Sequence, residues 1–90
     1  MKFKVLDIFQ HFGSESQEKK LVEEVFEFLK AYTLYTNGLD TREHVVEEFS
    51  DVELLMLQFK EVLRITDTEQ EKENNFKIKR TFEKYKIGSK

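Results

Sequence analysis

The sequence predicts an all-α protein, a small domain of the four-helix-bundle type. Apolar residues recur every three or four positions over four stretches, which is the period of a helix. The chain contains no proline, and its three glycines, at positions 13, 38 and 88, fall at the edges of those stretches, where helices commonly end. Because no linker or repeat interrupts the pattern, residues 1–90 are expected to form a single domain.

The first two helices follow from this periodicity and from one start signal. A short helix is expected over about residues 3–12. Ser14, followed three residues later by Gln17, has the spacing of a capping box and predicts the start of a long second helix. That helix is expected to end before Asn37 and Gly38. Its apolar stripe consists of Val22, Val25, Leu29 and Tyr32.

The third and fourth helices have similar start signals. Asp40 with Glu43 predicts the first of these starts, and Thr66 with Glu69 predicts the second. The apolar stripe of the third helix repeats in alternating steps of four and three, as in the packing seam of a bundle. It consists of Val45, Phe49, Val52, Met56, Phe59 and Leu63.

Residues 54–57, Leu-Leu-Met-Leu, are apolar on every side of the third helix. A helix that is apolar all round has to be buried all round. We therefore expect the chain to oligomerise through its long central helices. The alternative is that the first and fourth helices cover this stretch within one chain.

Composition excludes several functional classes. Fifteen basic and eighteen acidic residues give a net charge of −3, which argues against a nucleic-acid polymer as partner. The absence of cysteine excludes disulfides, thiolate zinc sites and a catalytic thiol. No apolar run could span a membrane, and the first ten residues lack the apolar stretch of a signal peptide, so no membrane partner and a cytoplasmic location are expected.

Two acidic pairs provide the strongest functional signal. Glu24 and Glu27 are three residues apart, as are Glu48 and Asp51, which places both carboxylates of each pair on one side of a helix. The short connection between the two helices predicts antiparallel packing that brings the pairs together. Four gathered carboxylates repel one another unless a cation lies among them, and such oxygen ligands suit Mg²⁺, with Mn²⁺ as a substitute. The alternative is that both pairs lie on ordinary solvated helix faces.

The two histidines have no such pattern. His11 and His44 are lone residues near expected helix ends, without the Glu-x-x-His spacing of di-iron bundles. We expect both to be ordinary surface or capping residues.

The acidic pairs belong to a longer pattern. Residues 23–27, Glu-Glu-Val-Phe-Glu, are followed after twenty residues by Glu48-x-x-Asp51. Gln17, Lys20 and Leu21 form a Q-x-x-K-L lead-in, residues 47–53 read E-E-F-S-D-V-E with Gln58 following, and residues 76–80 read F-K-I-K-R. In this order the motifs resemble those of the MazG-type nucleotide pyrophosphohydrolases, which belong to the all-α NTP pyrophosphatase superfamily. The last motif resembles a Y-K-L-N-R element of that family.

The resemblance implies Mg²⁺-dependent hydrolysis of nucleoside triphosphates to the monophosphate and pyrophosphate, in the service of cleaning the nucleotide pool. It implies four metal ligands, Glu24, Glu27, Glu48 and Asp51. It also implies that Glu23 is an auxiliary catalytic carboxylate, which either lies behind the ligands or contributes to a further ion. It also implies substrate-binding roles for Gln17, Lys20, Lys77 and Arg80. Lys79 stands where the family element has Asn, a departure that bears on substrate preference. The implied assembly is a homodimer or a dimer of dimers, with active sites completed across subunits.

These residue types suit that chemistry. Mg²⁺ neutralises phosphate charge and lowers the pKa of a coordinated water, while carboxylates can accept the proton of that water. Lysine and arginine bind phosphate oxygens as charged donors. The alternative function is a non-catalytic helical interaction or regulatory module, in which the acids form a solvated face and the third-helix stripe binds a partner.

Overall fold

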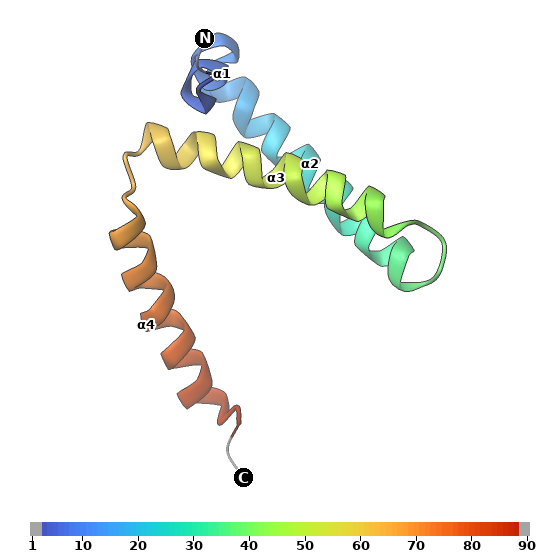
Figure 1. Cartoon of the computed structure of the whole chain (residues 1–90), viewed down its shortest axis with the longest axis vertical. Helices are drawn as coiled ribbons and strands as arrows, with labels where there is room; N and C mark the ends of the chain where they lie inside the picture. Colours follow the sequence, from blue (N-terminus) through green and yellow to red (C-terminus); the bar gives the residue numbers. More distant parts are fainter. Residues whose placement is uncertain (1–2, 89–90) are drawn as a thin grey trace.

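A computed structural model describes residues 3–88 of the chain and confirms the all-α prediction (Figure 1). Within this range the helices are α1 (Val5–Phe12), α2 (Ser14–Thr36), α3 (Arg42–Val62) and α4 (Asp67–Tyr85). In the same range, none of these helices has the length and hydropathy needed to cross a membrane.

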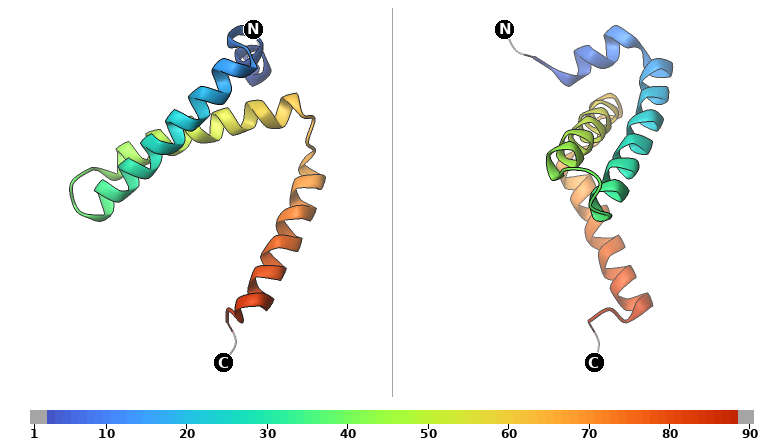
Figure 2. Two further views of the ribbon diagram at one scale, coloured as in Figure 1. Left: turned by 180° about the vertical axis from the view of Figure 1, so that it is seen from behind. Right: turned by 90° about the vertical axis from the view of Figure 1, so that its right-hand side faces the viewer.

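The first three helices pack together. α2 and α3 form an antiparallel hairpin joined by a short turn, and α1 packs against both at the far end of the hairpin from that turn (Figures 1 and 2). Two edge-to-face aromatic contacts link these helices. The rings of Phe9 and Phe59 have centroids 5.4 Å apart, and those of Phe28 and Phe49 are 5.8 Å apart.

The face of α2 that packs inward differs from the predicted stripe. The buried and half-buried side chains follow the heptad of Gln17, Leu21, Glu24, Phe28 and Ala31. The predicted stripe that begins at Val22 is largely exposed in the single chain. The inward face lies one residue before the predicted stripe. Apolar periodicity did not identify it, because polar side chains, those of Gln17 and Glu24, occupy two of its positions.

On α3 the apolar stretch at residues 54–57 is only partly covered. Leu55 is buried, but Leu54 is 50 % exposed, Met56 52 % and Leu57 38 %. The first and fourth helices therefore do not enclose this stretch within one chain. Of the apolar residues between positions 3 and 88, only Ala31 and Leu55 are buried.

One of the three predicted start signals is confirmed. Thr66 caps α4 in a reciprocal capping box, because its Oγ1 accepts from the Glu69 amide at 3.1 Å and the Glu69 carboxylate accepts from the Thr66 amide at 2.8 Å.

The other two start signals were misread. α2 begins directly after Gly13, whose φ of +87° suits glycine, and Ser14 Oγ donates to Glu18 instead of capping. α3 is capped by Thr41, one residue after the predicted Asp40, and the Thr41 Oγ1 accepts from the His44 amide at 3.2 Å.

α4 leaves the other helices and packs against none of them within residues 3–88 (Figures 1 and 2). Side-chain bonds from Lys60 to Asp67 and Gln70 join its first turns to α3. The expected bundle is thus built from three helices in one chain, with the fourth extended away. The Cα radius of gyration is 16.7 Å, against about 12 Å for a compact domain of this length.

Candidate functional site

The hairpin of α2 and α3 gathers three of the four predicted ligand carboxylates. Glu24 from α2 and Glu48 and Asp51 from α3 each place a carboxylate oxygen so that all three lie within 4.8 Å of one another. The side chains of Glu24 and Glu48 are each 16 % exposed, because both residues occupy inward positions of their heptads. Asp51 lies at the exposed edge of the group.

The electrostatics of this group are unfavourable. Burial raises the pKa of Glu24 above its ordinary value, and the charges of Asp51 and Glu48 raise it further. The Lys20 ammonium, 3.7 Å from the Glu24 carboxylate, lowers the same pKa and offsets part of this effect. Three close carboxylates with one exposed lysine beside them have the chemistry of a site for a hard divalent cation.

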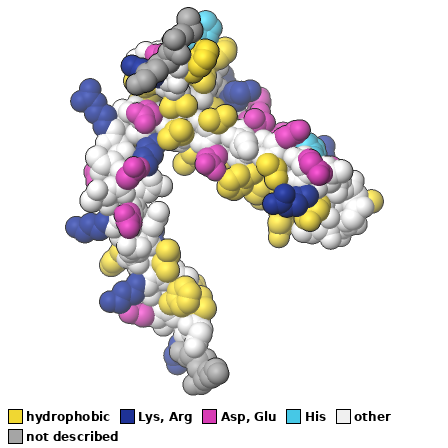
Figure 3. Space-filling model, viewed as in Figure 1, with side chains coloured by type: hydrophobic (Ala, Val, Ile, Leu, Met, Phe, Trp, Pro, Cys, Tyr) yellow, Lys and Arg dark blue, Asp and Glu magenta, His cyan; other side chains and the backbone are white. Residues whose placement is uncertain are grey.

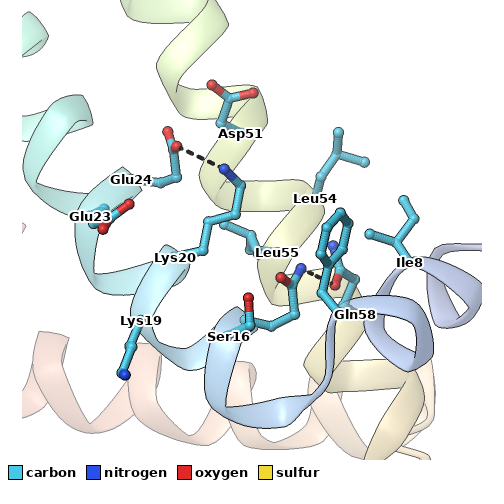
Figure 4. Close-up of a pocket in the computed structure, with 12 residues that line it drawn as sticks. Ile8, Ser16, Lys19, Lys20, Glu23, Glu24, Asp51, Leu54, Leu55 and Gln58 are labelled. Carbon is cyan, nitrogen blue, oxygen red and sulfur yellow. Dashed lines mark hydrogen bonds and ion pairs between the residues drawn. The ribbon is translucent and has the colours of Figure 1, made fainter.

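A cavity of about 600 Å³ opens beside the group (Figure 4). Glu23, Glu24, Asp51 and Lys20 line one side of it, and the Lys20 and Glu24 side chains point toward each other there. Ile8 and Leu54 lie on the side away from Glu23 and Glu24. The cavity therefore offers both charged and apolar walls to a ligand.

Two buried amides also line the cavity. Gln17 is 2 % exposed and Gln58 3 % exposed, and the Gln17 amide Nε2 donates to Gln58 Oε1 at 2.8 Å. The Gln17 Oε1 atom is buried and has no hydrogen-bond partner among the described residues. Gln17 thus lines the cavity, but it does not take part in the capping box that its spacing with Ser14 predicted.

The remaining predicted residues are distributed unevenly. Glu23 lines the cavity with an exposed side chain. Glu27 is exposed and lies outside the three-carboxylate group. Lys77 and Arg80 lie on α4, which does not approach the group within the described chain, and the Arg80 guanidinium stacks over the Phe76 ring at 5.7 Å.

His44 is the residue that sequence reasoning missed. Its Nδ1 lies 2.6 Å from Asp40 Oδ2, and its Nε2 lies 3.2 Å from Glu48 Oε1. The hydrogen bond to Asp40 raises the pKa of His44, and the same bond lowers the pKa of Asp40. The signal was the spacing, because Asp40, His44 and Glu48 follow one another in steps of four. His44 and Glu48 share one side of α3, and Asp40 stands directly before the Thr41 cap of that helix.

Comparisons with protein-family models, curated proteins and solved structures find no significant match to this chain.

Proposed function

We propose that this protein is a MazG-like nucleoside triphosphate pyrophosphohydrolase that converts a triphosphate and water to the nucleoside monophosphate and pyrophosphate. The observation that carries the proposal is the meeting of Glu24, Glu48 and Asp51 in one group. Glu24 and Asp51 also line the cavity, whose side away from Glu24 carries the apolar side chains of Ile8 and Leu54. The carboxylates can hold the metal ion of a metal–triphosphate, and the apolar side of the cavity can accommodate a nucleobase. The expected setting is the cytoplasmic nucleotide pool.

In this proposal Glu24, Glu48 and Asp51 hold Mg²⁺, and Mn²⁺ can replace it. When bound, the ion supplies charge neutralisation on the phosphates and acidifies water. Glu27 is the fourth ligand on the sequence pattern alone, since it lies about one turn from Glu24 on α2 but outside the gathered group.

The chain's own residues have the complementary tasks. Glu23, an exposed carboxylate on the cavity wall, is placed to accept the proton of the attacking water. Lys20 is placed to donate to a phosphate oxygen once a cation takes its place beside Glu24. The unpartnered Gln17 Oε1 supports a ligand at this cavity, because an orphaned buried acceptor costs about 1–3 kcal/mol and a donor would recover it.

We further propose that the working unit is a homodimer or a dimer of dimers. The chain exposes 7961 Å², about 2,400 Å² more than the roughly 5,600 Å² of a compact monomer of 10.9 kDa. That excess matches the large, apolar interfaces of obligate oligomers. Hydrophobic side chains line both sides of the open angle between α3 and α4, as Figure 3 shows. A second copy seated against these faces explains why an apolar stretch of α3 is left uncovered.

This assembly also gives Lys77 and Arg80 a route to a phosphate. α4 does not reach the three-carboxylate group of its own chain, so these two residues can act only at the corresponding group of another copy. The C-terminal part of α4, residues 77–85, carries four basic residues and one acidic residue. Its charge is thus complementary to the acidic face of α3.

The test of the catalytic proposal is pyrophosphate release from a panel of common and modified nucleoside triphosphates, with and without Mg²⁺. We expect metal-dependent release by the wild type and none by Asp51→Asn. Glu61→Gln is the matched control, because it removes one exposed carboxylate from the same helix away from the group. Equal activity of Asp51→Asn and the control would refute the site assignment.

A non-catalytic interaction module remains the second candidate, favoured by the large exposed apolar surface. It predicts no pyrophosphate release from any triphosphate and no stabilisation of the folded protein by Mg²⁺. It also predicts that the apolar face of α3 binds a different protein instead of a second copy. Light scattering separates these cases, because a sharp monomer at micromolar concentration would contradict the proposed oligomer.

A further inference from the structure

We infer that His44 is a positioning residue that holds the Glu48 carboxylate in place for the cation, while Asp40 fixes the orientation of the His44 ring. The inference rests on the proposed metal site and adds two residues to it. Asp40, His44 and Glu48 form a continuous chain of hydrogen bonds, with ring-nitrogen-to-oxygen distances of 2.6 Å and 3.2 Å. In this chain both ring nitrogens donate, because a carboxylate can only accept. From the sequence, Asp40 was expected only as a helix start signal and His44 only as a surface or capping residue, so neither residue was expected at the metal site.

The geometry explains what the ring contributes. A glutamate side chain has three rotatable bonds, and an unrestrained carboxylate loses that freedom on binding an ion. Nε2–H of His44 donates to Glu48 Oε1 and restricts the carboxylate before the ion arrives. On the other side, Nδ1 of the same ring is held by Asp40, which is itself anchored because its Oδ1 accepts from the Thr41 amide at 2.7 Å. Donors behind metal ligands commonly contribute 10- to 100-fold in metal affinity.

Two isosteric replacements separate this role from a merely structural one. In His44→Gln the amide nitrogen occupies the position of Nε2 and can still donate to Glu48. In His44→Asn the amide nitrogen occupies the position of Nδ1 and can serve only Asp40. Both variants are neutral, polar and compatible with the helix, and they differ in which neighbour they reach.

The measurement is the dissociation constant for Mn²⁺, read from the electron paramagnetic resonance signal of the free ion in a titration of the full chain. We expect His44→Ala and His44→Asn to weaken Mn²⁺ binding by about 10-fold. His44→Gln should stay within about threefold of the wild type. Circular dichroism of each variant reports whether the helices remain folded, independently of metal affinity.

Four results would overturn the inference. If His44→Ala binds Mn²⁺ as tightly as the wild type, the ring does not position Glu48, although the metal site itself stands. If His44→Gln is as weak as His44→Ala, the donor at Nε2 is not what matters. A nitrogen coupling to Mn²⁺ in pulsed spectra of the wild type would make His44 a ligand instead. A wild type that binds no Mn²⁺ removes the proposed metal site and this inference with it.

Discussion

Replacing Glu24 by glutamine should stabilise the metal-free protein, even though it should abolish metal-dependent activity. Glu24 occupies an inward position, and its carboxylate lies within 4.8 Å of those of Glu48 and Asp51. The amide has the same shape and no charge. The substitution therefore removes two repulsions while it leaves the packing of α2 on α3 almost unchanged.

The size of the effect follows from the geometry. At 4.8 Å, two unit charges repel by about 0.9 kcal/mol in a medium like bulk water and by about 3.5 kcal/mol at an effective dielectric constant of about 20. The lost ion pair with Lys20, a half-exposed contact within one helix, offsets roughly 0.3–0.5 kcal/mol. Two such repulsions at the value for bulk water amount to about 1.7 kcal/mol, so after the lost ion pair we expect a net gain of at least about 1 kcal/mol. Such a gain raises the midpoint of thermal unfolding by about 4–8 °C per kcal/mol.

The gain should depend on pH in a defined direction. Because the pKa of Glu24 is raised in the folded state, the folded wild type binds this proton more tightly than the unfolded chain does. That contribution to stability is complete below the ordinary value of 4.5 and is lost as the pH rises through the raised value. The advantage of Glu24→Gln over the wild type should therefore be large at neutral pH and should vanish at about pH 4.

The assay is thermal unfolding followed by circular dichroism in the presence of a chelator, at one fixed protein concentration and at both pH values. Glu27→Gln is the matched control, since it neutralises an exposed carboxylate on the same helix outside the group. If Glu24→Gln gains no more than Glu27→Gln at neutral pH, or keeps its whole advantage at about pH 4, the argument from charge repulsion is wrong.

Three further outcomes are expected. Millimolar Mg²⁺ or Mn²⁺ should raise the unfolding midpoint of the wild type but not that of Asp51→Asn. An ion that binds only the folded state stabilises it by about 2.7 kcal/mol when its concentration is 100 times its dissociation constant. Equal shifts in both proteins would contradict the proposed metal site. Gln17→Leu and Gln58→Leu should each lower the free energy of unfolding, measured by denaturant titration, by about 1–3 kcal/mol, because each leaves the other buried amide without its hydrogen-bond partner. The double variant should lose less than the sum of the two single variants. Additive losses would mean that the two amides do not depend on each other. Inactive Asp51→Asn and Arg80→Ala chains should recover pyrophosphate release when they are mixed and allowed to exchange subunits. One chain retains the carboxylates and the other retains the arginine, so a mixed oligomer contains one complete site. Activity no higher than the sum of the separate proteins would contradict a site shared between copies.

Much of the fold could be predicted because the local signals agree with one another. Periodicity located all four helices, and the Thr66–Glu69 capping box was read correctly. The inward face of α2 was misplaced by one residue because Gln17 and Glu24 sit where apolar residues were expected. The departure of α4 could not be predicted, since a helix with one apolar stripe packs equally well on its own chain or on another.

The site was predictable to the extent that helical spacing determines proximity. Glu24, Glu48 and Asp51 were found because a step of three on each of two antiparallel helices brings them together. Glu27 was grouped with them by the same rule, but its side chain lies toward solvent. His44 could not be predicted from metal-ligand spacing, because its contacts depend on the steps of four to Asp40 and Glu48.

The buried pair of glutamines has a consequence for the alignment of the helical hairpin. If α3 slid along α2 by one turn, the Gln17 amide would face Leu55 or Val62 instead of Gln58, and two buried amides would lose their common hydrogen bond. The same slip would move Glu48 about 5.4 Å along the axis of α2 relative to Glu24. That displacement exceeds the 4.8 Å within which the carboxylate oxygens of the acidic group now lie. An interface made only of leucines would tolerate such a slip, but here it would break the hydrogen bond of Gln17 at the open end of the hairpin. This bond therefore favours a single register of α3 on α2, and that register keeps the acidic group in the middle of the hairpin together.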